Sequence, residues 1–177
     1  NAGTPFLGAQ NDSLADVESE GNITVAAGAQ INALKLGYAM LAAPNVSNAG
    51  TILAPDGQVI LAAGMGVVLN APTGKIANSW LVPGLVGTAY APGNPNGTPV
   101  FTATNTGLLQ ATTGNVTVLG ATVDQAGVIK VTTSITQPGE IDLIAADEGS
   151  GGNNTYERTG PLVLMPGSVT TVLPDED

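Results

Sequence analysis

The side chains with the clearest capacity for chemistry are carboxylates spaced two residues apart. They are Asp16, Glu18 and Glu20, then Glu140 and Asp142, with Asp147 next to Glu148 as a further pair. On a β-strand, residues i and i+2 point to the same face, so each alternating set would form an acidic row. Two carboxylates facing a cleft are the machinery of glycosidases, and carboxylates with loop carbonyls are natural calcium ligands.

The remaining composition argues against catalysis. The chain has no histidine and no cysteine, which removes Ser-His-Asp, Cys-His and the usual zinc sites. A polysaccharide lyase needs a basic residue, and only four lysines and arginines are scattered over the sequence. We therefore expect no catalytic residues, no cofactor and no enzyme activity, and we interpret the acidic rows as solvated faces. Calcium binding at one of them is the alternative.

The charge and hydropathy of the chain restrict its partners. Fourteen acids against four basic residues give a net charge of −10, which opposes binding to nucleic acid or to anionic lipid. No stretch approaches the roughly 20 apolar residues of a membrane span. Asn1–Ser19 lacks the basic start and apolar run of a signal peptide, so we expect a secreted form to be a mature product or an excised fragment.

Glycine-led units recur along the chain. Gly21-Asn-Ile-Thr-Val25 returns as Gly114-Asn-Val-Thr-Val118, with apolar residues two apart as in a half-buried strand. Similar units begin at Gly37, Gly57, Gly139 and Gly160, and leader units begin at Gly50, Gly74, Gly107 and Gly127. The full repeat, as from 37 to 57 and from 139 to 160, is therefore about 20 residues long.

A unit of this length cannot bury its own apolar face, but one coil of a solenoid buries it against the coils above and below. The pattern predicts an all-β chain, residues 1–177 forming a single parallel β-helix domain of roughly six to eight coils. A β-sandwich is the alternative, although its strands seldom repeat a glycine-led pattern so regularly. The predicted inward residues are Ile23, Val25, Ile31, Leu41, Val46, Ile52, Val59, Leu61, Val67, Leu69, Ile76, Leu109, Val116, Val118, Val123, Ile129, Val131, Ile141, Leu143, Leu162, Leu164 and Val169.

Two stretches interrupt the repeat. Residues 78–106 contain four prolines, which cannot donate to a β-ladder, and predict an extra-helical excursion that leaves the coil after Ile76 and rejoins it at Gly107. Its rings Trp80, Tyr90 and Phe101 are the candidate ligand-binding residues, able to stack on sugars or anchor a partner. The alternative is that they pack the excursion onto the solenoid wall. Residues 148–159 are glycine-rich and predict a flexible loop.

Several sequence segments resemble recurrent segments of the filamentous haemagglutinin-like exoproteins of two-partner secretion. They are Asn48-Ala-Gly-Thr-Ile-Leu-Ala-Pro-Asp-Gly-Gln-Val-Ile-Leu-Ala-Ala-Gly64 with Val67-Val-Leu69, Gly21-Asn-Ile-Thr-Val-Ala-Ala-Gly28, and Thr159-Gly-Pro-Leu-Val-Leu-Met-Pro-Gly-Ser-Val-Thr170. The resemblance implies a right-handed parallel β-helix with an adhesive or presenting role at the outer surface of Gram-negative bacteria. It also implies export by an outer-membrane transporter partner and ligands on host or neighbouring cells. The family's Asn-Pro-Asn motif lies early in its secretion domain, whereas Asn94-Pro-Asn96 lies inside the excursion.

The ends of the repeat region suggest how the solenoid is covered. Residues 1–20 are acidic and less repetitive, and we expect them to form a partial N-terminal cover. Gly160–Val172 has the pattern of a regular coil. We expect the exposed end of this coil to be covered by continuing chain or by end-to-end self-association. The expected function is a structural or adhesive segment of a secreted surface exoprotein. The alternatives are a polysaccharide-binding or polysaccharide-degrading β-helix and a self-assembling filament subunit.

Overall fold

The computed structural model describes residues 21–64, 66–70, 82–86, 101–134, 138–145, 147–148, 156–157 and 160–175. Within these ranges the chain forms strands and turns and contains no helix. It follows that no helix in the described part is long and apolar enough to cross a membrane. Most of the strands belong to three parallel sheets, here named A, B and C.

The strands are assigned to sheets as follows. Sheet A contains β1 (Asn22–Val25), β4 (Asn45–Asn48), β9 (Thr102–Asn105), β12 (Thr122–Gln125) and β17 (Leu162–Leu164). Sheet B contains β2 (Gln30–Asn32), β5 (Thr51–Leu53), β10 (Leu108–Ala111), β13 (Val128–Thr133) and β18 (Val169–Pro174). Sheet C contains β3 (Tyr38–Ala43), β6 (Gln58–Ala63), β11 (Asn115–Gly120) and β14 (Glu140–Ala145). Two antiparallel pairs lie apart from them: β7 (Gly66–Asn70) with β8 (Val82–Val86), and β15 (Asp147–Glu148) with β16 (Tyr156–Glu157).

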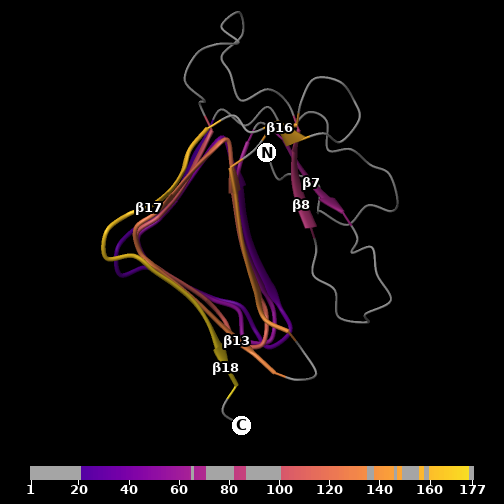
Figure 1. Ribbon diagram of the computed structural model, residues 1–177, viewed down its shortest axis with the longest axis vertical. Coiled ribbons are helices and arrows are strands. Elements are labelled where there is room, and N and C mark those ends of the chain that lie inside the picture. The colour runs from indigo at the N-terminus through magenta and orange to yellow at the C-terminus, as the bar shows by residue number, and fades with distance from the viewer. Residues whose placement is uncertain are drawn as a thin grey trace, which may run out of the picture.

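The chain passes from sheet A to B to C and back to A, and so winds in stacked coils with a triangular outline (Figure 1). Coil 1 is β1–β3, coil 2 is β4–β6, coil 3 is β9–β11 and coil 4 is β12–β14, while β17 and β18 form two sides of coil 5. This confirms the all-β class with parallel stacked sheets and is compatible with the predicted β-helix. The parallel pairing excludes the β-sandwich for the described residues. The described residues also form fewer coils than the six to eight expected.

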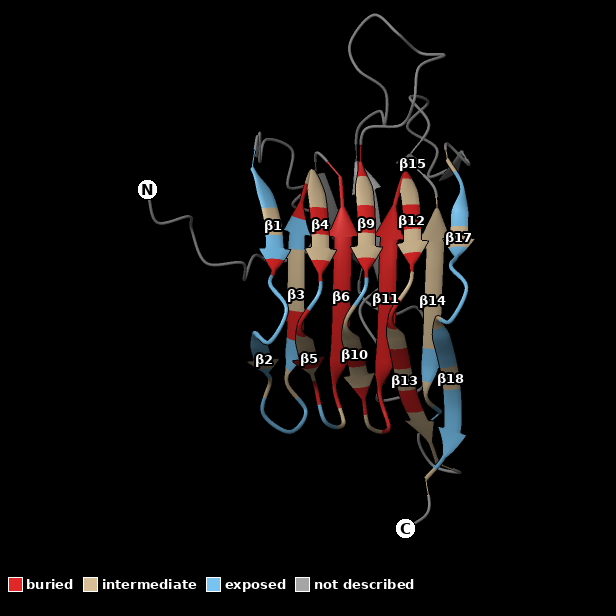
Figure 2. Cartoon of the chain, turned by 90° about the vertical axis from the view of Figure 1, so that its left-hand side faces the viewer, coloured by how far each residue is buried: buried red, intermediate tan, exposed pale blue. Residues whose placement is uncertain are grey.

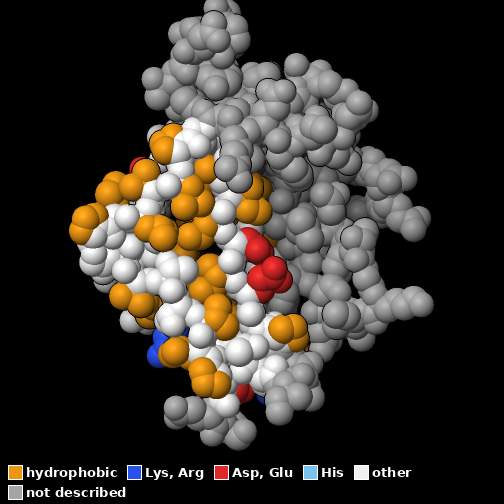
Figure 3. Space-filling view, in the orientation of Figure 1, with side chains coloured by type: hydrophobic (Ala, Val, Ile, Leu, Met, Phe, Trp, Pro, Cys, Tyr) orange, Lys and Arg blue, Asp and Glu red, His pale blue; other side chains and the backbone are white. Residues whose placement is uncertain are grey.

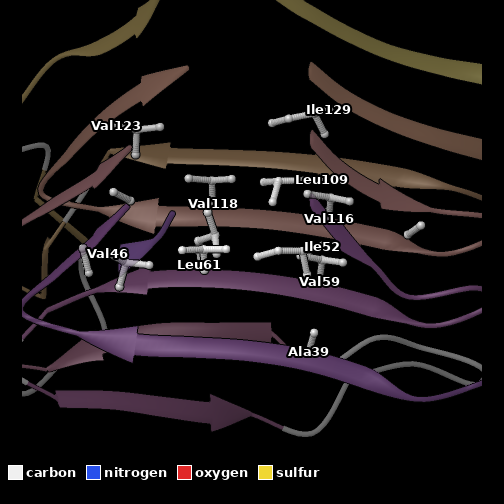
Figure 4. Packing of buried hydrophobic residues seen from close by; sticks show 14 of the residues in the cluster. Ala39, Val46, Ile52, Val59, Leu61, Leu109, Val116, Val118, Val123 and Ile129 are labelled. Carbon is white, nitrogen blue, oxygen red and sulfur yellow. The ribbon is translucent and has the colours of Figure 1, made fainter. Parts of the chain in front are cut away.

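The core runs along the inside of the stack, because alternate residues of each strand point inward (Figure 4). In sheet B the column Ile52, Leu109 and Ile129 is wholly buried. Burial is most complete in the middle coils and decreases toward both ends (Figure 2). The predicted inward residues of β1 to β6 and of β10 to β14 lie in or against this core. Val169 is an exception. It pairs with Val128, whose neighbour Ile129 is buried and points into the core, so Val128 and Val169 point outward.

Two columns of glycine mark the corners. Gly50, Gly107 and Gly127 stack before sheet B, and a Cβ on either of the last two would overlap the backbone of the glycine in the preceding coil. Gly37, Gly57 and Gly114 stack in the same way before sheet C. The leader units at Gly50, Gly107 and Gly127 are therefore confirmed as equivalent positions, while Gly74 lies outside the described residues.

Two of the predicted equivalences are wrong. Asn22–Val25 lies in sheet A, whereas the similar Asn115–Val118 lies in sheet C. Gly160 precedes sheet A and stacks on Ala121, so it is not the counterpart of Gly139, which precedes sheet C. The reason is that a glycine followed by alternating apolar residues fits the start of a strand on any of the three sides.

The excursion is longer than the sequence predicted. The chain leaves the coil after β6 and rejoins it at β9. The sequence had predicted that it leaves after Ile76 and rejoins at Gly107. Val67 and Leu69, expected to point into the core, belong to the antiparallel pair β7–β8. β8 lies beside β6 and β11, outside the triangle of the coils (Figure 1). Residues 1–20, Ile76 and the loop between β15 and β16 lie outside the described residues.

The corner from sheet B to sheet C uses left-handed backbone in three successive coils. Leu36, Asp56 and Thr113 have φ values of 62°, 51° and 45°, and each precedes the stacked glycine of its coil. Asp tolerates this conformation, but leucine and threonine are strained in it. The corner geometry therefore persists even where the residue type opposes it.

Substituting Leu36 with Asn is expected to raise the free energy of unfolding by about 0.5–1 kcal/mol, because asparagine relieves the left-handed strain. Little packing is lost, since the Leu36 side chain is 73% exposed. The matched control is Leu34→Asn, since Leu34 is 86% exposed and lacks the positive φ. Urea unfolding of both variants tests this, and an equal response in the two would contradict the strain argument.

The corner from sheet A to sheet B is held by a buried ladder of amide side chains. Asn48 Nδ2 donates to Asn105 Oδ1, and Asn105 Nδ2 donates to Gln125 Oε1, both over 2.8 Å. Each amide also bonds its own corner: Asn48 Oδ1 accepts from Gly50 N, and Gln125 Nε2 donates to Gly127 O. We name Asn48, Asn105 and Gln125 the amide ladder.

Coils 1 and 5 turn the same corner without an amide. Val25 and Leu164 occupy the ladder position there, and each is followed by a longer turn. Ala29 N donates to Ala26 O in one, and Ser168 N donates to Met165 O in the other, with Gly28 and Gly167 at φ 80° and 85°. A φ near 80° at the third residue is that of a type II turn. The amide side chain thus replaces a backbone turn wherever the corner shortens to two residues.

Candidate functional site

A cluster of polar side chains lies on the outer face of sheet C. Gln58, Asn115 and Glu140 occupy one row of β6, β11 and β14, and Thr117 and Asp142 lie in the next row. Gln58 Nε2 donates to Asn115 Oδ1 and Asn115 Nδ2 donates to Asp142 Oδ2, both over 3.0 Å. Thr117 Oγ1 also donates to Asn115 Oδ1, over 2.8 Å. Together these residues form a hydrogen-bonded chain that ends on a carboxylate.

The outer face is covered at its centre and open at the end of the stack. Gln58, Asn115 and Thr117 are buried, as is the apolar cluster of Ile60, Ala62 and Leu119 farther along the same face. Glu140 is exposed and Asp142 half-buried, because β14 is the last strand of sheet C. Acidic side chains gather on this side of the molecule in Figure 3. Solvent and partners can therefore reach the carboxylates but not the buried amides.

Glu140 and Asp142 share one face of β14, as their alternation predicted. The negative charge of Asp142 raises the pKa of Glu140, and burial and a hydrogen bond between the two carboxyls act in the same direction. This acidic pair is suited to holding a proton or meeting a cation.

Glu140→Gln is expected to stabilise the protein at neutral pH. The folded-state pKa lies above the unfolded value, so charged Glu140 lowers stability at every pH above the folded pKa. As the pH falls through the folded pKa toward the unfolded one, the wild type gains stability and the difference from the variant closes. Chemical denaturation between pH 4 and 7 measures this closing gap.

Asp56→Asn provides a control of opposite sign. The Thr113 hydroxyl donates to Asp56, and this lowers the Asp56 pKa against the opposing effect of burial; Lys35 Nζ, 3.2 Å away, adds to the lowering. Asp56 therefore contributes stability above its unfolded pKa that is lost as the pH falls through its folded pKa. The variant should be less stable than the wild type at neutral pH and converge on it in acid. The same sign in both variants would refute the electrostatic assignment.

The other predicted site residues are not brought to the acidic pair. Phe101 is 8% exposed and belongs to the solenoid core, so it is a packing residue and not an exposed ring. Trp80 and Tyr90 lie outside the described residues, as do Asp16, Glu18 and Glu20. For calcium, no group of three or more acidic side chains that could hold a metal occurs in the described part of the chain.

Sequence reasoning missed the amide ladder, although the sequence carries its signal. Asn48-Ala-Gly50, Asn105-Thr-Gly107 and Gln125-Ala-Gly127 share an amide residue two positions before a column glycine. The spacing from Asn105 to Gln125, 20 residues, equals one repeat and was enough to place both in one column.

The fold and this site define an all-β protein of stacked parallel sheets with a polar, partly acidic outer face. No protein-family model, no curated protein and no solved structure matches the chain.

Proposed function

We propose that the chain is a structural and adhesive segment of an exported bacterial surface protein, wound as a right-handed parallel β-helix. In this role the coils form a stiff shaft, and the excursion presents a surface to host or neighbouring cells. An outer-membrane transporter would export the chain. The resemblance to filamentous haemagglutinin-like exoproteins motivates the handedness, the export route and the location.

One observation supports the presenting role above the others. Asn48 and Asn105 stack although they are 57 residues apart, and Gln58 and Asn115 stack over the same separation. The coils before and after the excursion therefore meet in register on more than one side. A shaft that keeps its register around a long insertion can carry that insertion without being changed by it.

Deleting residues 64–100 tests the proposal and keeps Phe101, which packs in the core. Ala63 would then join Phe101 directly, as Gly120 joins Ala121 in the corner of the next coil. The deletion shortens the 57-residue step to the 20 residues that separate Asn105 and Gln125. Ile60→Thr and Leu119→Thr would accompany it, because the outer apolar cluster loses its cover.

The readout is binding of fluorescent protein to bacterial and epithelial cells, with circular dichroism to verify the fold. We expect the full chain to bind and the folded deletion variant to lose at least tenfold in affinity. Equal binding by both proteins would place adhesion on the coils. No binding by the full chain would contradict an adhesive role.

A panel of acidic and neutral polysaccharides, with and without calcium, should show no turnover, and depolymerisation abolished by Asp142→Asn would favour the enzymatic alternative.

A further inference from the structure

The outer face of sheet C is packed like an interior in the middle coils. β6 and β11 are buried at every position, whereas β4 and β9, the sheet A strands of the same coils, are buried only at alternate residues (Figure 2). The outward residues Ile60, Ala62 and Leu119 form an apolar cluster that is wholly buried. Because an apolar face gains stability only when water is excluded from it, this face is built to carry a closely packed cover.

The excursion supplies part of that cover through β8. This strand lies beside β6 and β11 on the outer side of sheet C and pairs with β7 (Figure 1). A two-stranded hairpin is only marginally stable by itself in water. Pro83 lies within β8, and proline has no backbone N–H to donate to a ladder. The β7–β8 hairpin therefore depends on the other neighbours of β8 for its position.

One of these neighbours comes from a different part of the chain. We name the segment between β14 and β17 the second insertion; it contains the β15–β16 hairpin, and β15 lies beside β8. The excursion and the second insertion leave the same corner, from sheet C to sheet A, in coils 2 and 4, while coil 3 passes this corner through Ala121 alone. Ile144, near the end of β14, packs against the same outer apolar cluster. The two insertions thus meet across coil 3, over one apolar face.

We propose that the β15–β16 hairpin is a positioning element that holds β8 on sheet C, so that the excursion and the second insertion form one structural unit. Only two residue pairs join β15 to β16, so this hairpin also gains stability from its contact with β8. The coupling is reciprocal, because each hairpin favours the ordered position of the other by the same free energy. A consequence for cell binding rests on the adhesive role proposed above, whereas the coupling itself does not.

Two variants remove the β15–β16 hairpin. The first deletes residues 146–159, so that Ala145 joins Gly160 directly. Ala145 pairs with Gly120, and Gly160 stacks on Ala121, so the new junction is equivalent to the native Gly120-Ala121 junction of the preceding coil. The second variant replaces residues 146–159 with Gly-Ser repeats of equal length. It is the matched control for the length of the connection, because it keeps that length and removes only the hairpin.

Amide hydrogen exchange is the primary readout. We expect the amides of β7 and β8 to exchange at least about tenfold faster in both variants than in the full chain. The amides of β5 and β10, in sheet B, should keep their protection and so verify that the coils remain folded. Reciprocally, the deletion of residues 64–100 should accelerate exchange of the β15 and β16 amides by a similar factor. Both hairpin variants should also bind cells more weakly, although residues 64–100 are intact.

Three outcomes would overturn the proposal. Unchanged exchange of the β7 and β8 amides in both variants would show that the β15–β16 hairpin does not hold β8. Full protection in the Gly-Ser variant alone would assign the effect to the connection and not to the hairpin. Equal acceleration in β8 and in sheet B would show that the second insertion stabilises the coils as a whole. Exchange is measured whether or not the chain binds cells, so failure of the coupling and failure of the adhesive role are distinguishable.

Discussion

Replacing Asn105 with alanine is expected to lower the free energy of unfolding by about 3–5 kcal/mol, which is enough to unfold a marginal domain. Asn105 is wholly buried at the centre of the amide ladder, where it accepts from Asn48 and donates to Gln125. Its loss leaves Gln125 Oε1 without its donor and opens a cavity in a close-packed interior. Buried polar groups left without partners are among the costliest defects in a protein.

Asn105→Leu separates the two contributions, because it restores the volume but not the hydrogen bonds. We expect it to recover only the cavity part, so that it remains about 2 kcal/mol less stable than the wild type. Thr104→Ala, on the outward face of the same strand, is the control for altering β9 and should cost little. A leucine variant as stable as the wild type would show that the ladder contributes no net stability.

Gly57→Ala is expected to cost at least about 3 kcal/mol, because the new methyl group has no space. A Cβ on Gly57 overlaps the carbonyl oxygen of Gly37 in the coil before it, and backbone cannot move aside as a flexible side chain can. The coils must separate locally, which weakens the flanking pairing of β3 with β6.

Gly28→Ala is the matched control, because Gly28 has a φ of 80° but no atom within 4 Å of its Cβ position. This variant carries only conformational strain, about 1–2 kcal/mol. Thermal unfolding followed by circular dichroism compares the two. Equal losses would mean that backbone conformation, and not the close approach of coils, explains the glycine columns.

The stacked parallel architecture could be predicted because its main determinant is local. Gly50 and Gly107 each precede their partner glycines, Gly57 and Gly114, by seven residues, and the structure places the members of each kind in one column. A solenoid repeats one set of packing constraints in every coil, so the same residue types return at the same spacing. The sequence therefore predicts the stack without any knowledge of a distant contact.

The assignment of individual strands to sides could not be predicted as well. The phrases at Asn22–Val25 and Asn115–Val118 lie on different sheets, because alternation specifies an inward and an outward face but not which face of the triangle. Corner chemistry distinguishes the sides: amide-x-Gly leads from sheet A to B, and a left-handed residue before glycine leads from B to C. For the candidate site, the shared face of Glu140 and Asp142 was predictable from spacing, whereas their position on an edge strand depends on where β14 falls in the stack.

The directions of the hydrogen bonds have a mechanical consequence. The hydrogen bonds between coils run along the axis of the stack. Tension applied to the two chain ends would therefore break them sequentially and would not shear many of them at the same time. Each 20-residue coil released would lengthen the chain by about 65 Å, at roughly 3.3 Å per residue. Release of the 57-residue step would add about 190 Å at once. Under applied force the molecule would thus unfold in a series of short extensions, one for each coil, interrupted by one long extension.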